Sequence, residues 1–523
     1  MSRLSLRRCL LMLATFDVVT LSRLQFALTA IFHMLWPVLS TGLAIYLVVL
    51  EAIWLRTRNP IYYRQARFWA KLYVLNFGIG VASGLPMEFQ FGTNWAPLSE
   101  FAGDFLGSVL GFEGAMAFML EAGFLGIMLF GWQKVPPVIH FLSTVMVAFG
   151  ANLSVFWILS ANSWLQTPSG GTFSDGHFHV QNYFAAINNP FMVRSVIHMA
   201  LATVETSMLV VAAISAWSLM RQKAPEFFLF SFKLALVSLL AVAPLQILAG
   251  HESAVQVAEH QPTKLAAIEA LWDDQAAGSS PAWTVLASPD EASGSNRWSL
   301  SVPGAFSWIL ETRPQHSQPL RGLNSWPTDQ RPHMVGLLFY AFRVMVAIGL
   351  AATALMALSL LLWWRGGLSA ASFARWPWFS WAWILSAPAG YLAIESGWVV
   401  RCVGRQPWTV YGQLRTAYAA SVLPVGEVLT SLSVFAVLYT VLLVFALYFG
   451  SRIIANRNWQ FAGRWLPSHL SGHGALGDPY RCRRSLHRLP LDLGEPQQPG
   501  GGSHADPGLR ADRLHLLDSQ NQW

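Results

Sequence analysis

Long apolar runs recur along this chain and constrain its fold more than any other feature. Each holds about 20 residues or more, enough for a helix to cross about 30 Å of hydrocarbon. The runs are continuous instead of alternating, and lipid offers backbone amides no water to bond, so helices are expected and barrel strands are not. The predicted fold class is all-α, a polytopic transmembrane bundle of about nine helices. The spans are expected at 24–55, 68–91, 105–132, 138–164, 191–220, 227–250, 334–364, 376–400 and 425–450.

Positive charges gather in alternate loops between these runs. Lys and Arg are enriched on the cytoplasmic side of membrane proteins, so these loops are predicted to be cytoplasmic, with the N-terminus outside and the C-terminus inside. The loop after 376–400 departs from this pattern, because Arg401, Arg405 and Arg415 lie on the side predicted to be external. The basic residues of the cytoplasmic loops are Arg56, Arg58, Arg64, Arg67, Arg221, Lys223, Arg365 and Arg375.

The chain divides into five predicted segments. Residues 1–16 place basic side chains on the outer side and are expected to lie outside the working fold. Segments 17–250 and 334–455 hold transmembrane helices one to six and seven to nine, and the polar segment 251–333 is an extracytoplasmic loop. The composition of 456–523 predicts a disordered cytoplasmic tail. The three scattered cysteines predict no disulfide framework, and the net charge of +7 accompanies no nucleic-acid-binding motif.

Ionisable residues inside the apolar runs are functional candidates, since a charge near the bilayer centre is costly. His33 and His198 each stand alone among apolar neighbours, and Glu395 lies in the eighth run. A lone buried histidine is more often a satisfied core residue than a ligand, so the residues alone leave both roles open. His140, near the end of a run, is a weaker case.

Two carboxylates, Glu113 and Glu121, share one predicted helix. Eight residues separate them, which corresponds to about 12 Å of rise and about 80° around the axis of a regular helix. Carboxyl groups spaced along a span suit a stepwise proton path. The alternative is that each one is protonated and hydrogen-bonds to a neighbouring helix.

Five separated motifs carry a resemblance to a known family. They are 21–29 leading to His33, 87–95, 264–269, 342–345 and 404–408. Each of them resembles cytochrome bd oxidase subunit I, and the similarity covers roughly residues 17 to 455. It fails before about residue 16 and after about residue 465, which agrees with the expectations of an N-terminal segment outside the working fold and of a disordered tail.

The resemblance implies three haem groups and their ligands. His198 and Met345 match the axial ligands of a low-spin b haem, and a His–Met pair saturates the iron and favours electron transfer. His33 and Glu395 match the axial ligands of two high-spin haems, of which one is haem b and the other haem d or a further haem b. Arg343 matches an arginine beside the low-spin haem.

The resemblance also implies a reaction, the oxidation of quinol at the outer loop and the reduction of dioxygen to water. Lys264 and Glu269 match quinol-loop residues, where a carboxylate can accept a hydroxyl proton and an ammonium can hold a quinone oxygen. They are five residues apart, so on a regular helix they point to different faces. Glu113 and Glu121 match carboxylates that bring cytoplasmic protons to the high-spin haems. Ubiquinol or menaquinol and dioxygen are the expected substrates.

The short loop 251–333 resembles the cyanide-insensitive branch of this family, in which haem d can be replaced by haem b. Expected partners are a second membrane subunit, subunit II, and in some relatives a small single-span subunit, all in the bacterial cytoplasmic membrane. A competing interpretation is a membrane dihaem subunit that passes on electrons without reducing dioxygen. It needs His198 and Met345. It has no use for four further residues together, which are His33, Glu113, Glu121 and Glu395. A transporter explains buried carboxylates but not a His–Met ligand pair.

Overall fold

The computed structural model describes residues 17–276, 279, 282–305 and 320–455. The predictions for 1–16 and for the tail from residue 456 onward fall outside these ranges. Within them the chain is mainly helical, which confirms the all-α fold class.

Long helices form the body of the described part of the chain. Eight of its helices are long and apolar enough to cross a membrane by length and composition. The third of these spans is built from three consecutive segments, an α-helix, a π-helix and a second α-helix. In chain order the helices are α2 (Val18–Thr57), α3 (Pro60–Thr93), α4 (Ala96–Phe112) with η1 (Glu113–Phe118) and α5 (Met119–Phe130), α6 (Pro137–Gln166), α8 (Met192–Met220), α9 (Pro225–His260), α12 (Val335–Trp364) and α16 (Val425–Ala455).

The predicted span 376–400 is a helix in the structure, α14 (Pro377–Val403), but it is not among those eight. It nevertheless packs inside the bundle, between α8 and α12. Trp383 of α14 is buried and its Nε1 donates to Ser359 Oγ of α12 at 3.0 Å. The prediction of about nine helices therefore describes the bundle, while length and hydropathy alone single out eight of them.

Helix boundaries follow local sequence at the turn between α2 and α3. Asp17 caps the start of α2, because its carboxylate accepts from Thr20 N at 2.7 Å. At the other end Arg58 adopts a left-handed conformation with φ 54°, which ends the helix. Asn59 then accepts from Ile61 N at 3.0 Å and Pro60 opens α3, where its missing N–H costs nothing.

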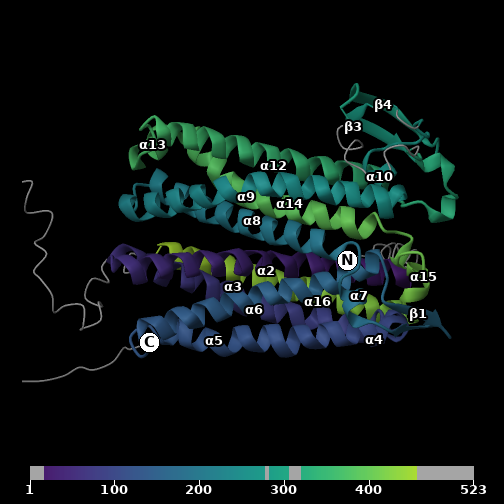
Figure 1. The fold of residues 1–523 in the computed structure, drawn as a ribbon, viewed down its shortest axis with the longest axis horizontal. Coiled ribbons are helices and arrows are strands. Elements are labelled where there is room, and N and C mark those ends of the chain that lie inside the picture. Colours follow the sequence, from purple (N-terminus) through teal and green to yellow (C-terminus); the bar gives the residue numbers. More distant parts are fainter. Residues whose placement is uncertain (1–16, 277–278, 280–281, 306–319, 456–523) are drawn as a thin grey trace, which may run out of the picture. The chain divides into compact units, whose positions relative to one another are not determined.

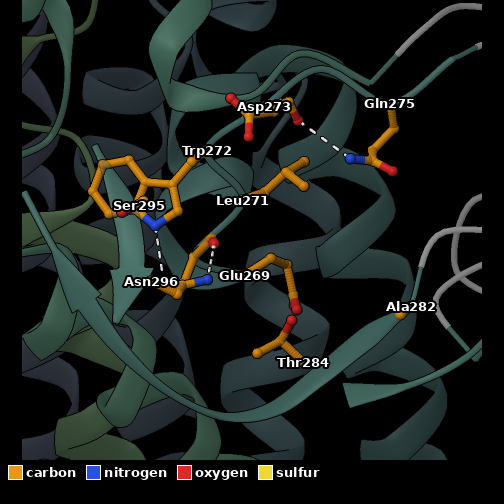
Figure 2. A pocket seen from close by; sticks show the side chains of 10 residues that line it. Glu269, Leu271, Trp272, Asp273, Gln275, Ala282, Thr284, Ser295 and Asn296 are labelled. Carbon is orange, nitrogen blue, oxygen red and sulfur yellow. Dashed lines mark hydrogen bonds between the residues drawn. The ribbon is translucent and has the colours of Figure 1, made fainter. Parts of the chain in front are cut away.

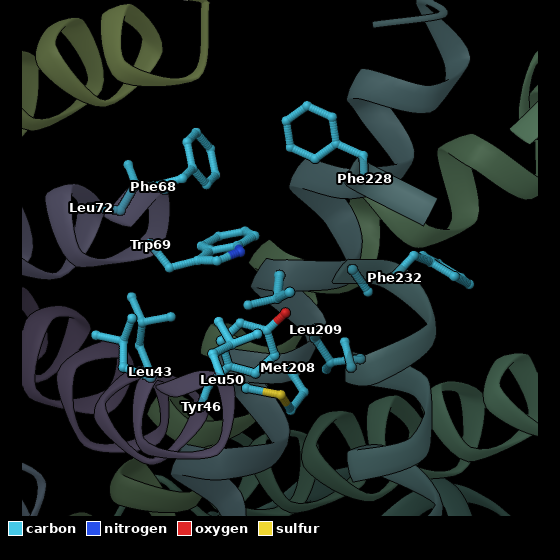
Figure 3. Packing of buried hydrophobic residues seen from close by; sticks show 14 of the residues in the cluster. Leu43, Tyr46, Leu50, Phe68, Trp69, Leu72, Met208, Leu209, Phe228 and Phe232 are labelled. Atoms are coloured by element: carbon cyan, nitrogen blue, oxygen red, sulfur yellow. The ribbon is translucent and has the colours of Figure 1, made fainter. Parts of the chain in front are cut away.

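A large apolar cluster joins the helices of the bundle (Figure 3). Trp69 and Phe68 of α3 face Phe228 and Phe232 of α9, with Tyr46 of α2 beside them. Phe68 and Phe228 meet edge to face with ring centroids 5.8 Å apart. This packing holds α2, α3, α8 and α9 against one another and fixes the positions of the polar residues that they carry.

Short elements gather at one end of the bundle (Figure 1). The described residues form three antiparallel hairpins, β1–β2, β3–β4 and β5–β6. The helix α9 continues past its predicted end at 250, and α10 follows it within the segment that was predicted as a loop. The short elements are β1 (Gly171–Ser174), β2 (His177–Val180), α7 (Tyr183–Ile187), α10 (Pro262–Ile268), β3 (Trp283–Asp290), β4 (Ser295–Val302), η2 (Leu323–Ser325), η3 (Thr328–Gln330), β5 (Trp408–Val410), β6 (Leu414–Arg415) and α15 (Thr416–Ala419), with α13 (Ala370–Arg375) at the opposite end.

Candidate functional site

His33 lies on α2, where a short hydrogen-bond chain orients its ring. The Ser83 hydroxyl of α3 donates to Gly80 O at 3.0 Å, and His33 Nδ1 lies 3.0 Å from the same Oγ. With the Ser83 hydroxyl donating to Gly80 O, its oxygen is available to accept from Nδ1–H, and in that tautomer Nε2 keeps its lone pair. Gly84 packs against the ring, and a Cβ there would lie 3.0 Å from His33 Cε1.

His198 lies near the start of α8, close to a basic residue of α14. Its Nδ1 is buried without a hydrogen-bond partner among the described residues. One turn earlier, Ser195 Oγ accepts from Arg401 Nη1 at 2.8 Å, so Arg401 lies within electrostatic range of His198. On the other side, a Cβ at Gly250 of α9 would lie 3.6 Å from His198 Cε1. The ring therefore sits between α8, α9 and α14 with an unused nitrogen.

Met345 and Glu395 lie on adjacent helices, α12 and α14. The Met345 thioether packs on Gly397, where a Cβ would lie 3.1 Å from Sδ. Glu395, two residues before this glycine, has an Oε2 atom that is buried without a hydrogen-bond partner within the described ranges. The two helices therefore supply two kinds of donor atom between them, the soft thioether sulfur of Met345 and the carboxylate oxygen of Glu395.

The two carboxylates Glu113 and Glu121 are separated by a π-helical turn. A π-helix has more residues per turn than an α-helix, so the angle between the two side chains is smaller than the 80° predicted for a regular helix. Both meet the same face of α6. Ser154 Oγ donates to Glu113 Oε1, and Gly150, one turn earlier, packs on the backbone of Glu121. Tyr73 OH of α3 donates to Glu121 Oε1.

A pocket lies between α10 and the β3–β4 hairpin, with Glu269 at its floor (Figure 2). Its wall is held by two hydrogen bonds of Asn296, which accepts from Trp272 Nε1 at 2.9 Å and donates to Ala270 O at 3.0 Å. Other residues that line it are Leu271, Asp273, Gln275, Ala282, Thr284 and Ser295. The pocket thus combines one buried carboxylate with aromatic and amide groups.

Glu269 forms a buried ion pair with Arg343 of α12. Arg343 Nη2 lies 2.6 Å from Glu269 Oε2, and Nη1 lies 3.5 Å from Oε1. The guanidinium also donates to Thr284 O, so it joins α10, β3 and α12. Burial raises the pKa of the Glu269 carboxyl to about 7, although the charge of Arg343 acts in the opposite direction. A carboxyl with this pKa can accept and release a proton near neutral pH.

Lys264 faces away from this pocket. Its Nζ donates to Gln166 Oε1 at 2.7 Å and to Arg401 O at 3.3 Å. Burial lowers the pKa of Lys264 well below its usual value, and the charges of Arg401 and Arg405 add to this effect. Lys264 and Glu269 therefore point to different faces, as their spacing predicted, and the structure does not bring them together as one pair.

His140, the weaker histidine candidate, has both ring nitrogens engaged. Nδ1 lies 2.9 Å from Glu51 Oε2, and Nε2 lies 3.0 Å from Met128 O. Thr144 Oγ1 donates to the other oxygen of Glu51 at 2.8 Å. No ring nitrogen is left over for a ligand, so His140 is a structural residue that joins α2 and α6.

Comparison with known proteins decides the family. The family model for cytochrome bd terminal oxidase subunit I matches residues 21–458. The chain belongs to this family. It is 34% identical over 433 residues to the cytochrome bd ubiquinol oxidase subunit 1 of Bacillus subtilis (strain 168), covering 81% of this chain and 91% of the relative. It is also 34% identical over 499 residues to the cytochrome bd-II ubiquinol oxidase subunit 1 of Escherichia coli (strain K12), covering 83% and 95%.

The fold comparison agrees with this family. The bd oxidase from Geobacillus thermodenitrificans shares 28% identity with this chain at a TM-score of 0.76, covering 84% of this chain and 98% of that chain. The resemblance noted from the five sequence motifs is thereby confirmed. Cytochrome bd oxidase subunit I is a multi-pass membrane oxidoreductase subunit that carries haem.

The donor atoms of this bd oxidase subunit fit haem iron. His198 Nδ1 and Glu395 Oε2 are buried without partners, and such polar atoms are costly unless a bound group satisfies them. No hydrogen bond of His33 Nε2 is found among the described residues, and Gly84 and Gly397 allow the neighbouring helices to approach His33 and Met345 closely. Bound haem would supply the redox-active iron, while these residues would hold and orient it.

Four residues that support the site were not among the predicted ones. Ser83 orients His33, Ser154 and Tyr73 bond the two carboxylates, and Arg401 approaches His198. Each is a polar side chain within or next to an apolar run, and this feature of the sequence could have identified it as a candidate site residue. Their partners lie on other helices, so the sequence alone does not pair them.

Proposed function

We propose that this chain is the haem-bearing subunit of a cytochrome bd-type terminal oxidase that oxidises quinol and reduces dioxygen to water. Oxidation of quinol is the activity named for its relatives: those in Bacillus subtilis and Escherichia coli are ubiquinol oxidase subunits, and a further Bacillus subtilis relative is named a putative menaquinol oxidase subunit. Membership of the family and the match along most of each relative support the same reaction here.

One observation carries the proposal for quinol. The pocket carboxylate Glu269 is ion-paired with Arg343, and Arg343 lies two residues before Met345 on α12. A quinol bound in the pocket would lose two protons and two electrons in becoming a quinone. Glu269 would accept one hydroxyl proton and water at the pocket the other, and the electrons would enter a low-spin haem b held by His198 and Met345. Arg343 would position Glu269 and respond to its charge. Lys264 lies on the other face of α10, outside the pocket, and would not contact this quinol.

The proposal places dioxygen chemistry at two high-spin haems held by His33 and Glu395. One is haem b, and the other is haem d or a further haem b. A single protein ligand to each leaves a coordination position open, which is the requirement for binding dioxygen. The free Nε2 of His33 and the unpartnered Oε2 of Glu395 support this role.

Protons for this chemistry would travel along α5, η1 and α6. Tyr73 donates to Glu121, Ser154 donates to Glu113, and the two carboxylates are close enough to interact electrostatically. Proton uptake from the cytoplasm and release at the quinol pocket would separate charge across the membrane without a pump. The same contacts would be made by structural carboxyls, so substitution has to decide between the two roles.

The proposed assembly contains a second membrane subunit, subunit II, in the bacterial cytoplasmic membrane, and a small single-span subunit can accompany it. Exposed apolar side chains on α16, among them Val437, Val441 and Leu447, are suited to lipid or to another membrane subunit. The orientation, with the pocket outside, follows the distribution of basic loops.

The experiment that tests the proposal is an oxygen-electrode measurement on the purified complex of this chain with its subunit II. With a ubiquinol or menaquinol analogue as donor, steady consumption of dioxygen is expected. A dihaem subunit that only passes on electrons would oxidise quinol in the presence of an electron acceptor and would leave dioxygen untouched. That second result would contradict the proposal.

A further inference from the structure

Three basic residues form a cation cluster near the end of the bundle that holds α10. They are Lys264, Arg401 and Arg405. Lys264 and Arg405 are only 2% and 7% exposed, and Gly404 lies against the Lys264 side chain, where a Cβ would be 2.9 Å from Cγ. None of the three forms an ion pair within the part of the chain that the structure describes.

The cluster also contains unused donors. Arg401 gives Nε to Asn162 Oδ1 and Nη1 to Ser195 Oγ, but its Nη2 is buried without a hydrogen-bond partner among the described residues. Nε and Nη1 of Arg405 are likewise buried without a hydrogen-bond partner in the described part of the chain. Isolated buried cations are strongly unfavourable unless an anion and hydrogen-bond acceptors compensate them. The cluster therefore has the chemistry of an anion site, with fork-shaped donors suited to carboxylates.

Arg415, the third arginine of this region, differs from Arg401 and Arg405 because it forms an ion pair at the surface. Arg415 pairs with Asp329, with Nη2 2.6 Å from Oδ2, and both side chains are accessible to solvent. The cationic loop that contradicted the predicted orientation therefore divides into two parts. Arg415 is neutralised by an acidic residue, whereas Arg401 and Arg405 point into the protein. Their charge is better explained by a bound group than by membrane topology.

The position of the cluster indicates which anion it meets. Arg401 is bonded to Ser195, one turn before His198 on α8, and acts electrostatically on His198. On α14 it lies four residues after Gly397, the residue on which Met345 packs. The cluster thus adjoins both proposed ligands of the low-spin haem. A haem b carries two propionate carboxylates, which provide the missing negative charge and the missing acceptors.

We propose that Arg401, together with Arg405 and Lys264, binds the propionates of the low-spin haem and raises its midpoint potential. This inference rests on the proposed function, since it takes His198 and Met345 as the ligands of that haem. Positive charge beside the propionates favours the reduced iron, because the reduced haem is the more negative form. Lys264 then serves the haem as a charge-compensating residue, which accounts for its position outside the quinol pocket.

The test is a spectroelectrochemical titration of the low-spin haem in the purified two-subunit complex. Arg401→Gln removes one charge, and we expect the equilibrium between reduced and oxidised haem to shift toward the oxidised form by about tenfold, or about 59 mV for one electron. Arg401→Lys keeps the charge and should retain most of the wild-type potential. Arg415→Gln, in the same loop but paired with Asp329, is the matched control and should leave the potential unchanged.

A second variant, Arg405→Gln, and titrations in two lipid compositions complete the test. If Arg401→Gln does not assemble, Arg405→Gln tests the same cluster and should shift the equilibrium in the same direction. An unchanged potential in an assembled Arg401→Gln or Arg405→Gln variant overturns the inference. Titration in nanodiscs of pure phosphatidylcholine and in nanodiscs with phosphatidylglycerol separates propionates from a lipid headgroup, because a shift seen only with the anionic lipid also overturns it.

The failure of this inference and of the proposed function give different results. If His198→Ala keeps an intact low-spin haem, the ligand assignment is wrong and the proposed function fails at that haem. If His198→Ala loses the low-spin haem while Arg401→Gln leaves its potential unchanged, only the cation-cluster inference fails.

Discussion

Arg343 and Glu269 form a buried ion pair, with Nη2 2.6 Å from Oε2, that joins the loop pocket to the helix carrying Met345. Any change in the charge of Glu269 is therefore felt by Arg343, two residues from the proposed haem ligand. A buried ion pair of this kind is weak evidence for stability, because desolvation of the charges offsets their attraction. In the proposed function, its position would instead couple quinol oxidation to the low-spin haem.

Substitution of Glu269 by Gln should separate quinol oxidation from dioxygen reduction. The change removes the proton acceptor and keeps the size of the side chain, so quinol-driven turnover should fall by about 100-fold or more. Dioxygen reduction driven by an artificial donor that bypasses the pocket should persist. Glu252→Gln is the matched control, because Glu252 is exposed and pairs with Arg194 at 3.3 Å. Equal loss of both activities in Glu269→Gln would mean that the pocket is structural.

The pH dependence of quinol oxidation should report the same carboxyl. Burial raises the pKa of Glu269 to about 7, so it is protonated below that pH and cannot accept a proton there. The rate at low quinol concentration should therefore rise as the pH increases through about 7. Glu269→Gln should lose this rising limb, and a limb of the same midpoint in the variant would assign it to another group.

Substitution of Gly397 on α14 by Ala should disturb Met345, the proposed haem ligand on the neighbouring helix α12. An added Cβ would lie 3.1 Å from Met345 Sδ, closer than an ordinary contact, so the thioether must move by a few tenths of an ångström. The absorption band of the low-spin haem should shift, with quinol oxidation slowed. Gly349→Ala is the control. Gly349 lies on α12, the helix of Met345, and nothing lies within 4 Å of its added Cβ. An unchanged band in Gly397→Ala would place the ligand elsewhere.

Substitution of Ser83 by Ala should weaken binding of the haem that His33 is proposed to hold. The hydroxyl fixes the ring so that Nε2 keeps its lone pair, and loss of such an orienting partner commonly costs about 10–100-fold in metal affinity or activity. Haem content by the pyridine haemochrome method, with the low-spin band measured in the same sample, reports the loss. Ser253→Ala serves as control, because among the described residues the Ser253 hydroxyl donates to Ala249 O of its own helix. Full haem occupancy and activity in Ser83→Ala would show that the hydrogen bond is dispensable.

Substitution of Glu113 or Glu121 by Gln tests the proton path. A path needs groups that exchange protons, so each variant should slow dioxygen consumption while electrons still enter from quinol, and the low-spin haem should stay reduced during turnover. Tyr73→Phe should have the same effect to a smaller degree, because it removes one contact of Glu121. Glu226→Gln, at an exposed helix start, should not. Gln preserves hydrogen bonding, so wild-type turnover in both carboxylate variants would indicate purely structural roles.

The bundle could be predicted from sequence because lipid demands continuous apolar runs. The weakest match is α14, where Pro388, Tyr391 and several serines and tryptophans lower the hydropathy of a helix that is nevertheless packed between α8 and α12. The π-helical turn between Glu113 and Glu121 was not predicted, since regular spacing assumes one helix type throughout. These differences come from packing between helices and not from local propensity.

Single candidate residues of the site could be predicted from the sequence, but the contacts between them could not. His33, His198 and the two carboxylates stand out as lone ionisable groups in apolar runs. Their partners come from distant sequence, as with Lys264 and Arg401, which are 137 residues apart, or Tyr73 and Glu121, which are 48 apart. The sequence places Arg401 at the start of a basic loop, and only the folded chain shows that its Nη2 atom is buried.

The most direct test of the central claim is the reduced-minus-oxidised absorption spectrum of the purified complex, compared between wild type, His198→Ala and Met345→Leu. We expect a low-spin haem b band in the wild type that is lost or converted to high spin in both variants, while the bands of the other two haems remain. An unchanged low-spin band in either variant would mean that His198 and Met345 do not hold this haem.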